Sequence, residues 1–146
     1  MKVAIAGDHA ALELRAIVLK TLKDLGHEVQ DLGPHTGDSV DYPDFAKAAC
    51  QLVAKGEAER AILVCGSGVG MAISANKIKG CRAAVLHNEF EAEMTRKHNN
   101  ANVACFGQRQ HGPAIVERCL KIFMTTEFEG GRHKTRVDKM NALEGF

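Results

Sequence analysis

Two patterns of hydrophobic and polar positions alternate along the chain. The clearest short apolar run is RAILVC at residues 60–65, which has no charged residue after Arg60. A run of this kind predicts a strand at the centre of a parallel sheet that is covered on both faces. Residues 9–25 show the second pattern, with apolar positions at helical spacing, and Gly26 follows as a usual helix stop.

The same alternation continues through the whole chain and predicts an α/β fold. Strands are expected at residues 2–7, 27–33, 60–65, 82–87 and 102–106. Helices are expected at residues 9–25, 43–55, 69–78, 88–97, 112–125 and 131–146, the last with a frayed tip. This order predicts a three-layer domain, in which a five-stranded parallel sheet has helices on both faces and a C-terminal helix follows. No internal repeat or linker interrupts residues 1–146, so we expect a single domain.

Composition limits the classes of partner. The 146 residues carry a net charge of about +1, with no long acidic or basic block, no Trp and one Tyr. These features argue against nucleic-acid binding. The longest charge-free run, residues 61–76, is shorter than the roughly 20 residues of a membrane-spanning helix. Asp8 and His9 interrupt the apolar start before a signal sequence could form. We therefore expect a soluble, cytoplasmic protein that binds neither nucleic acid nor membrane.

The five cysteines indicate reduced thiols. Their number is odd, and neither CxxC nor a Cys/His spacing typical of metal sites occurs. A reducing compartment is expected, without disulfides and without a metal. Cys50, Cys105 and Cys119 lie within apolar patterns and are interpreted as small buried hydrophobic residues.

Polar residues follow three of the expected strands. They are Asp8-His9, Cys65-Gly66-Ser67 and His87-Asn88. In open α/β sheets, ligands bind beyond the carboxyl ends of the strands. We therefore expect these three groups to lie near a binding site.

The sequence CGSGVG at residues 65–70 leaves two interpretations open. Its glycines do not match the spacing of the dinucleotide fingerprint or of the phosphate-binding P-loop. Glycines before a helix can still turn backbone N–H groups toward an anion, and a thiol in that position has its thiolate stabilised. Cys65 would then be a usable base or nucleophile. The alternative is a buried cysteine beside a packing glycine, and the residues alone favour neither.

Other candidate groups lie further along the chain. His98 has the chemistry for proton transfer near neutral pH, although Asn99 or Asn100 beside it could simply cap a helix. Arg132 and Arg136 are spaced to share one helix face and would suit a phosphate, although a solvated charged tail has the same pattern. Further candidate cations are Arg109 and His9.

The strings GDHAA, DYPDFA, CGSGVGMAISANK, RKHNNANV, FGQR and EGGRHKTRV occur in this order over nearly the whole chain. Together they resemble the type B ribose-5-phosphate isomerases, a family that also contains galactose-6-phosphate isomerase subunits. The resemblance implies a Rossmann-like fold and an aldose–ketose isomerase that uses no cofactor and no metal. It also implies a homodimer, or a dimer of dimers, with each active site between two subunits.

The resemblance implies roles for individual residues. Cys65 would be the base that moves a proton between C1 and C2, and His98 would open the furanose ring with Asp8 assisting. Ser67 is also expected to be a catalytic residue. The expected sugar and enediolate contacts are Asp8, His9, Asn99, Gly66, Ser67, Gly68, Val69 and Gly70. The expected phosphate contacts are Arg109, Arg132, Arg136 and His9.

Another branch of that family has glycine at the position of Cys65 and a glutamate base at the position of Met71. Because this chain has Cys65 and Met71, a cysteine mechanism is expected. Two alternatives remain for the function as a whole. The substrate could be a six-carbon sugar 6-phosphate, such as allose or galactose 6-phosphate, or the chain could be a nucleotide-binding regulatory module.

Overall fold

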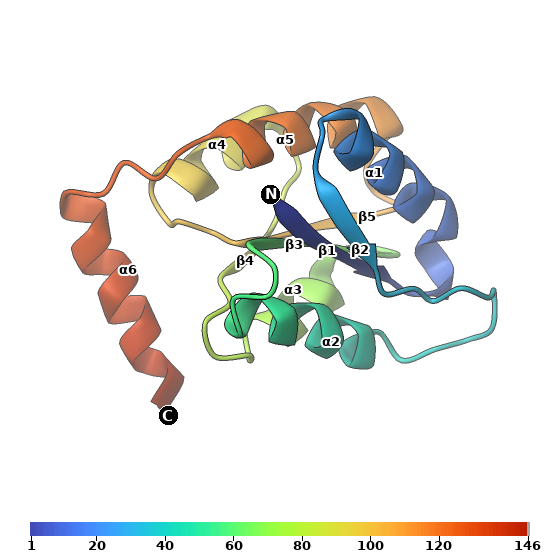
Figure 1. Cartoon of the computed structure of the whole chain (residues 1–146), viewed down its shortest axis with the longest axis horizontal. Coiled ribbons are helices and arrows are strands. Elements are labelled where there is room, and N and C mark those ends of the chain that lie inside the picture. The colour runs from blue at the N-terminus through green and yellow to red at the C-terminus, as the bar shows by residue number, and fades with distance from the viewer. Residues whose placement is uncertain (146) are drawn as a thin grey trace.

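A five-stranded sheet forms the middle of the molecule (Figure 1). The computed structural model describes residues 1–145. The strands are β1 (Lys2–Gly7), β2 (Glu28–Asp31), β3 (Arg60–Cys65), β4 (Ala83–Val85) and β5 (Val103–Gly107). They are parallel and lie in the order β2-β1-β3-β5-β4. The central strand β3 is buried along its whole length, as its apolar run predicts.

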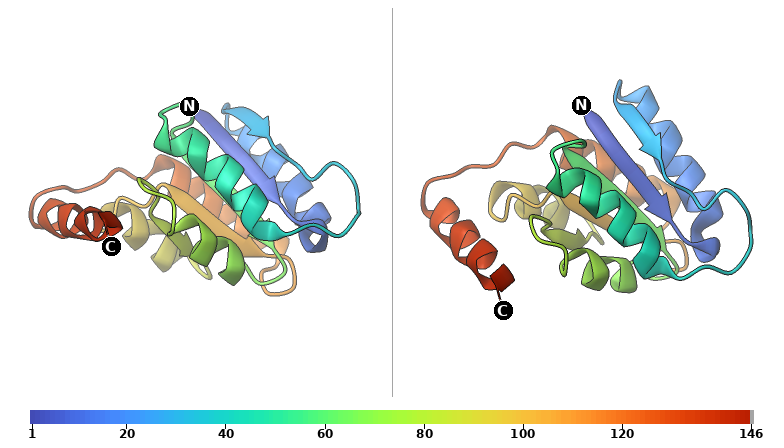
Figure 2. Two further views of the ribbon diagram at one scale, coloured as in Figure 1. Left: turned by 90° about the horizontal axis from the view of Figure 1, so that it is seen from below. Right: turned by 60° about the horizontal axis from the view of Figure 1, so that its bottom comes forward.

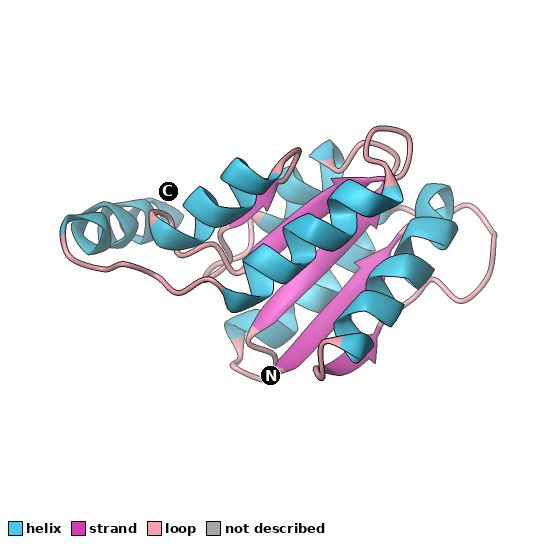
Figure 3. Cartoon of the chain, turned by 90° about the horizontal axis from the view of Figure 1, so that it is seen from above, coloured by secondary structure: helices cyan, strands magenta, loops and turns pink. Residues whose placement is uncertain are grey.

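Helices cover both faces of this sheet (Figure 3). One face packs against α1 (Leu12–Asp24), α4 (Glu89–Lys97) and α5 (Pro113–Thr125). The other face packs against α2 (Tyr42–Ala54) and α3 (Val69–Ala75). The predicted three-layer α/β architecture is therefore confirmed.

Several predicted boundaries shift. β2 and β4 are shorter than expected, and a 3-10 turn, His9–Ala11, precedes α1. The prediction placed the end of the third helix at residue 78, but α3 ends at Ala75. The side chain of Asn76 explains this end, because its amide exchanges two hydrogen bonds with the backbone of Ala83, at 2.9 and 2.8 Å. A residue that would have continued the helix instead anchors the edge strand.

The last helix, α6 (Arg132–Ala142), stands to the side of the three layers, beyond β4 (Figure 2). Arg82 donates a hydrogen bond to Asn141 at 3.2 Å, and the Gly80 amide donates to Glu144 at 2.9 Å. A 3-10 turn, Leu143–Gly145, ends the described chain, so position 146 of the predicted helix lies outside the described residues. None of the described helices is long and apolar enough to cross a membrane.

Candidate active site

The carboxyl ends of β1 and β3 bring two of the predicted polar groups together. The two strands are neighbours in the sheet, and the Asp8 amide donates a hydrogen bond to the Val64 carbonyl at 3.2 Å. A cavity of about 410 Å³ opens at this edge. Its lining comprises Asp8, His9, Ala10, Tyr42, Cys65, Gly66, Ser67, Gly70, Arg109 and Gln110. Seven residues that were expected at the site from the sequence therefore line one cavity. They are Asp8, His9, Cys65, Gly66, Ser67, Gly70 and Arg109.

Cys65 lies at the edge of this cavity, with only 5% of its surface exposed. The Gly68 amide donates a hydrogen bond to its sulfur over 3.1 Å. Gly68 has a φ of 83°, a left-handed conformation that favours glycine, and this conformation turns its N–H back toward the sulfur. The loop therefore directs a backbone donor at the thiol. Ser67 Oγ accepts a hydrogen bond from the Val69 amide at 3.2 Å and fixes the start of α3.

Two glycines are required by close packing around this loop. A Cβ on Gly107 would lie 2.4 Å from the carbonyl carbon of Ser67. A Cβ on Gly70 would lie 2.4 Å from the ring of Tyr42. The Ser67 backbone thus rests directly on the end of β5, and the Tyr42 ring rests on α3 at the cavity wall. Any larger residue at either glycine would displace the loop or the ring.

Asp8 and His9 are held by the turn that precedes α1. Asp8 Oδ1 accepts a hydrogen bond from the Ala10 amide at 2.9 Å and caps this turn. His9 Nδ1 accepts a hydrogen bond from the Val40 amide at 3.1 Å. This bond assigns the neutral ring proton to Nε2, which makes Nε2 a donor. Both side chains are therefore oriented by backbone contacts.

Arg109 is placed by the turn that follows β5. Its amide donates to the Gly66 carbonyl at 3.0 Å, and its guanidinium lies 3.5 Å from the position of a Cβ on Gly66. Inside this turn, His111 Nδ1 accepts a hydrogen bond from the Gly107 amide at 2.9 Å. Burial, together with neighbouring His87, lowers the pKa of His111, which favours the neutral ring that this bond requires. The turn thus carries a cation to the cavity.

The third predicted polar group, His87-Asn88, has a different role from the one expected. Asn88 caps the start of α4 by accepting from the Glu91 amide at 2.8 Å. His87 Nδ1 lies 2.7 Å from His111 Nε2. Neither residue lines the cavity that contains Cys65. His87 instead contacts the turn that carries Arg109, through His111 and Gln110.

Of the other predicted residues, Gly68 and Val69 lie in the loop beside Cys65, whereas His98 and Asn99 lie toward the amino ends of the strands. His98 caps the carboxyl end of α4, which runs back toward the amino end of β5. Gly107, at the carboxyl end of β5, is the sheet neighbour of Cys65. Val103 begins the same strand four residues earlier, so the amino end of β5 lies roughly 13 Å from Cys65 at the usual rise per residue. Asn99 lines a separate cavity of about 290 Å³. His98 and Asn99 therefore do not meet Cys65 within one chain.

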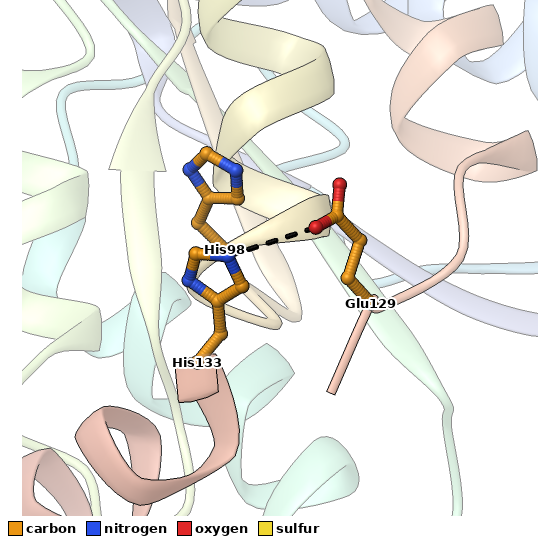
Figure 4. A group of neighbouring side chains, drawn as sticks. All are labelled: His98, Glu129 and His133. Atoms are coloured by element: carbon orange, nitrogen blue, oxygen red, sulfur yellow. Dashed lines mark ion pairs between the residues drawn. The ribbon is translucent and has the colours of Figure 1, made fainter. Parts of the chain in front are cut away.

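Arg132 and Arg136 also lie away from the cavity of Cys65. Both are exposed at the start of α6, and Arg136 folds back to donate to the Arg132 carbonyl at 3.0 Å. The His98 ring stacks on the ring of His133 in the same turn of α6, with centroids 4.1 Å apart (Figure 4). The four residues Asn99, His98, Arg132 and Arg136 thus form a second group, separate from the first.

The described thiols differ in their surroundings. Cys50, Cys105 and Cys119 are buried, as their apolar patterns predict, and Cys81 is buried too. Burial raises the pKa of Cys119 to about 11 and that of Cys105 further. Two of the described thiols line cavities. Cys65 lines the cavity that also contains Asp8, His9 and Arg109, whereas Cys81 lines a separate cavity with Arg82 and Glu144.

Tyr42, Gln110 and the pair formed by Glu129 and His133 were not singled out from the sequence. Tyr42 begins the string YPDFA, where Pro43 drew attention as a helix start. No local spacing could have joined His98 with residues about 30 positions later. Only the fold places them side by side.

Comparison with known proteins identifies relatives along the whole length. A family model described as Ribose/Galactose Isomerase matches residues 3–140. The Bacillus subtilis protein YwlF, described as a sugar phosphate isomerase, is 46% identical over 99% of this chain and 97% of its own. Ribose-5-phosphate isomerase B of Escherichia coli is 37% identical over 98% of this chain and 96% of its own. D-erythrulose-4-phosphate isomerase of Pectobacterium atrosepticum is 37% identical over 99% and 95%.

Solved structures share the fold closely. Ribose-5-phosphate isomerase B of Clostridium thermocellum matches with a TM-score of 0.97 and 42% identity, over 99% of this chain and 98% of that one. The Mycoplasma genitalium enzyme, solved with bound ribulose 5-phosphate, matches with a TM-score of 0.94 and 40% identity, over 99% and 96%.

Proposed function

This chain belongs to the ribose/galactose isomerase family, and from that premise we propose that it interconverts D-ribose 5-phosphate and D-ribulose 5-phosphate. The observation that carries the proposal is the cavity in which Cys65, the glycine loop that follows it and Arg109 meet. The cavity combines a thiol that can act as a base, the backbone of a glycine loop, and the positive charge of Arg109, which can bind a phosphate. Because the chain belongs to an isomerase family, we set aside the alternative of a nucleotide-binding regulatory module.

The proton transfer is assigned to Cys65. Its thiolate removes the proton from C2 of the open-chain aldose, and the electron pair moves to the carbonyl oxygen at C1, which gives an enediolate. Cys65 then returns the proton to C1, while the proton of the C2 hydroxyl passes to the oxygen at C1, so that C2 becomes the ketone carbon and C1 carries a hydroxyl. Backbone N–H groups of the loop at Gly66–Gly70, with Ser67 among them, stabilise the oxyanion. The hydrogen bond from the Gly68 amide supports this role, because it fixes the sulfur at the cavity and directs a backbone donor toward it.

Ring opening is assigned to His98, with Asp8 assisting. A furanose opens when its ring oxygen gains a proton and its anomeric hydroxyl loses one, so an acid and a base are needed. Asp8 and Asn99 are assigned to sugar hydroxyls. His9, Arg109, Arg132 and Arg136 are assigned to the phosphate, whose binding orients the reacting carbons.

Two copies of the chain are needed for this mechanism, and we infer a homodimer with its active sites between subunits. The support is geometric. Asp8, His9, Cys65 and Arg109 lie at one edge of the sheet, whereas the group with His98 and Arg132 lies at the other. A second copy that presents its His98 edge to the Cys65 cavity would complete both groups.

No cofactor or metal takes part in the proposed reaction, since every step uses a side chain or a backbone N–H group. We also infer that the protein works in a reducing compartment, the cytoplasm, as one catalytic domain. The support is that all five cysteines are free and buried.

A substrate of another chain length is the second candidate. One relative of 37% identity is named for a four-carbon sugar phosphate, at the same identity as the Escherichia coli enzyme. The six-carbon 6-phosphates also remain candidates. Comparing kcat/KM for ribose 5-phosphate, D-erythrulose 4-phosphate and allose 6-phosphate decides among them, and the proposal expects the largest value for ribose 5-phosphate.

The proposed function is tested by turnover of ribose 5-phosphate with EDTA present and with iodoacetamide in a parallel sample. Turnover that survives EDTA and is abolished by alkylation supports an isomerase with an essential thiol. A protein alkylated at Cys65, as located by mass spectrometry, that keeps its turnover contradicts the assigned mechanism.

A further inference from the structure

Three side chains with metal-binding atoms meet between the end of α4 and the start of α6. They are His98, Glu129 and His133 (Figure 4). One ligand atom from each lies within 4.8 Å of the others. The Glu129 and His133 side chains approach to 3.6 Å, and the two imidazole rings are stacked with an interplanar angle of 11°.

The backbone around this group is already fixed. The Glu129 amide donates to the Lys97 carbonyl at 3.1 Å, which ties the segment before α6 to the end of α4. The amide of His98 donates to Met94 at 2.9 Å, and that of His133 donates to Gly130 at 3.1 Å. Two segments, the end of α4 and residues 129–133, therefore hold the side chains together before any ion binds, which lowers the entropic cost of binding.

The distances suit a small divalent ion once the two stacked rings rotate out of parallel, because an ion lies in the plane of each imidazole that binds it. Zinc–nitrogen and zinc–oxygen distances of about 2.1 Å in a tetrahedron put ligand atoms roughly 3.4 Å apart. The Glu129–His133 distance is near this value, and the widest separation, at most 4.8 Å, must close by no more than about 1.4 Å. His133 is buried, whereas the Glu129 side chain is half exposed and free to rotate.

The charges around the group act in two directions. Desolvation, His98 and Arg132 lower the pKa of His133, which keeps its imidazole in the neutral form that binds metals. The positive charges of Arg132 and Arg136 oppose a cation, and the Glu129 carboxylate offsets one of them. The expected affinity is therefore moderate, well below that of a structural zinc site.

We propose that His98, Glu129 and His133 bind a divalent transition-metal ion of the zinc type, and that the bound ion inhibits the enzyme by occupying His98. Two imidazoles and one carboxylate are ligands that zinc commonly takes, with water in the fourth position. A metal-bound imidazole nitrogen has no lone pair left for a proton. The inhibition rests on the proposed function, in which His98 opens the sugar ring, but the binding does not.

Binding is tested first, by calorimetry with zinc chloride on the metal-free protein. The wild-type chain is expected to bind one ion per chain. Glu129→Gln and His133→Asn are each expected to weaken binding by about tenfold or more. His35→Asn, at an exposed histidine outside the group, and Cys65→Ser are expected to bind like wild type.

Cobalt(II) in place of zinc identifies the ligands, because thiolate ligation gives an intense charge-transfer absorption that imidazole and carboxylate ligands do not. The proposal expects no such absorption. It is overturned if no ion binds, if binding survives both Glu129→Gln and His133→Asn, or if Cys65→Ser removes it.

Inhibition is then measured as ribose 5-phosphate turnover against zinc concentration. Zinc is expected to lower wild-type turnover reversibly, with EDTA restoring it, while Glu129→Gln keeps its basal turnover and loses about tenfold or more of its zinc sensitivity. Equal inhibition of both proteins overturns the inhibitory role. A protein that binds zinc as described yet turns over no sugar phosphate would refute the proposed function and leave the metal site standing.

Discussion

The backbone amide of Gly68 donates a hydrogen bond to the sulfur of Cys65 over 3.1 Å. The bond joins the last residue of β3 to the residue that caps α3, so the loop between them surrounds the thiol. A negative sulfur accepts such a bond more strongly than a neutral one does. This contact gives Cys65 a setting that the other described thiols lack.

Replacing Cys65 by alanine should abolish most turnover while the fold is kept. A positioned proton-transfer group contributes roughly 10²- to 10⁴-fold to rate, so a loss of at least about 10²-fold in kcat is expected. Cys119→Ala is the matched control, because Cys119 is a buried thiol on the other face of the sheet. It should lose about 1 kcal/mol of stability and keep its kcat. Full turnover by a folded Cys65→Ala protein would sink the cysteine mechanism.

Gly107→Ala should damage the site through the backbone of Ser67. The new Cβ would lie 2.4 Å from the Ser67 carbonyl carbon, so the loop must move. Overpacking of this kind costs about 1–3 kcal/mol, and we expect kcat to fall with it. Gly112→Ala is the control, since nothing lies within 4 Å of its Cβ position, and it should cost less than about 1 kcal/mol. Thermal denaturation and turnover of both variants measure this difference in stability and kcat. Equal stability and equal kcat in the two variants would show that the loop tolerates the displacement.

His98→Asn should impair ring opening more than proton transfer. Ribose 5-phosphate closes into a furanose, whereas ribulose 5-phosphate stays open because its O5 carries the phosphate. Initial rates in the two directions should therefore fall unequally, with the larger loss, about tenfold or more, from the ring form. Equal losses in both directions would remove ring opening from the role of His98.

The stability of the protein should fall as the pH drops below about 6.5, in part through His111. Burial lowers the pKa of His111 in the folded chain, so the unfolded chain takes up its proton at a higher pH. The contribution of His111 is complete above the unfolded pKa and is lost as the pH falls through the lower folded value. His111→Asn keeps an acceptor near the position of Nδ1 but does not titrate.

Urea denaturation at a series of pH values checks this expectation. His111→Asn should show a shallower fall of the unfolding free energy below pH 6.5 than wild type does. His27 and His133, whose pKa values are also lowered, contribute equally to both proteins. Parallel curves for the two proteins would show that His111 does not titrate on folding.

Much of the fold could be predicted because its signals are local. A few residues suffice to predict two of its features. They are the apolar run that forms β3 and the helix end at Gly26, which has a φ of 88°. The end of α3 could not be read in this way. It depends on hydrogen bonds between Asn76 and Ala83, seven residues apart on different elements.

Part of the candidate site could likewise be predicted from local signals, and part could not. Asp8 and Cys65 could be placed together because each directly follows a strand, and parallel strands end at one edge. The sequence could not tell that His98 lies at the other edge of the same chain, because that follows from the direction in which α4 runs back. The stacking of His98 on His133 depends on where α6 turns after α5, which no local pattern encodes.

The most direct test of a site made by two copies is complementation between two chains that are each strongly impaired. Cys65→Ala and His98→Asn proteins are purified, mixed in equal amounts, allowed to exchange subunits, and assayed with ribose 5-phosphate. In a mixed dimer one site has both defects and the other has neither, so random exchange should restore about a quarter of the wild-type sites. If the mixture stays as inactive as its components after exchange has been demonstrated, Cys65 and His98 do not act in one shared site.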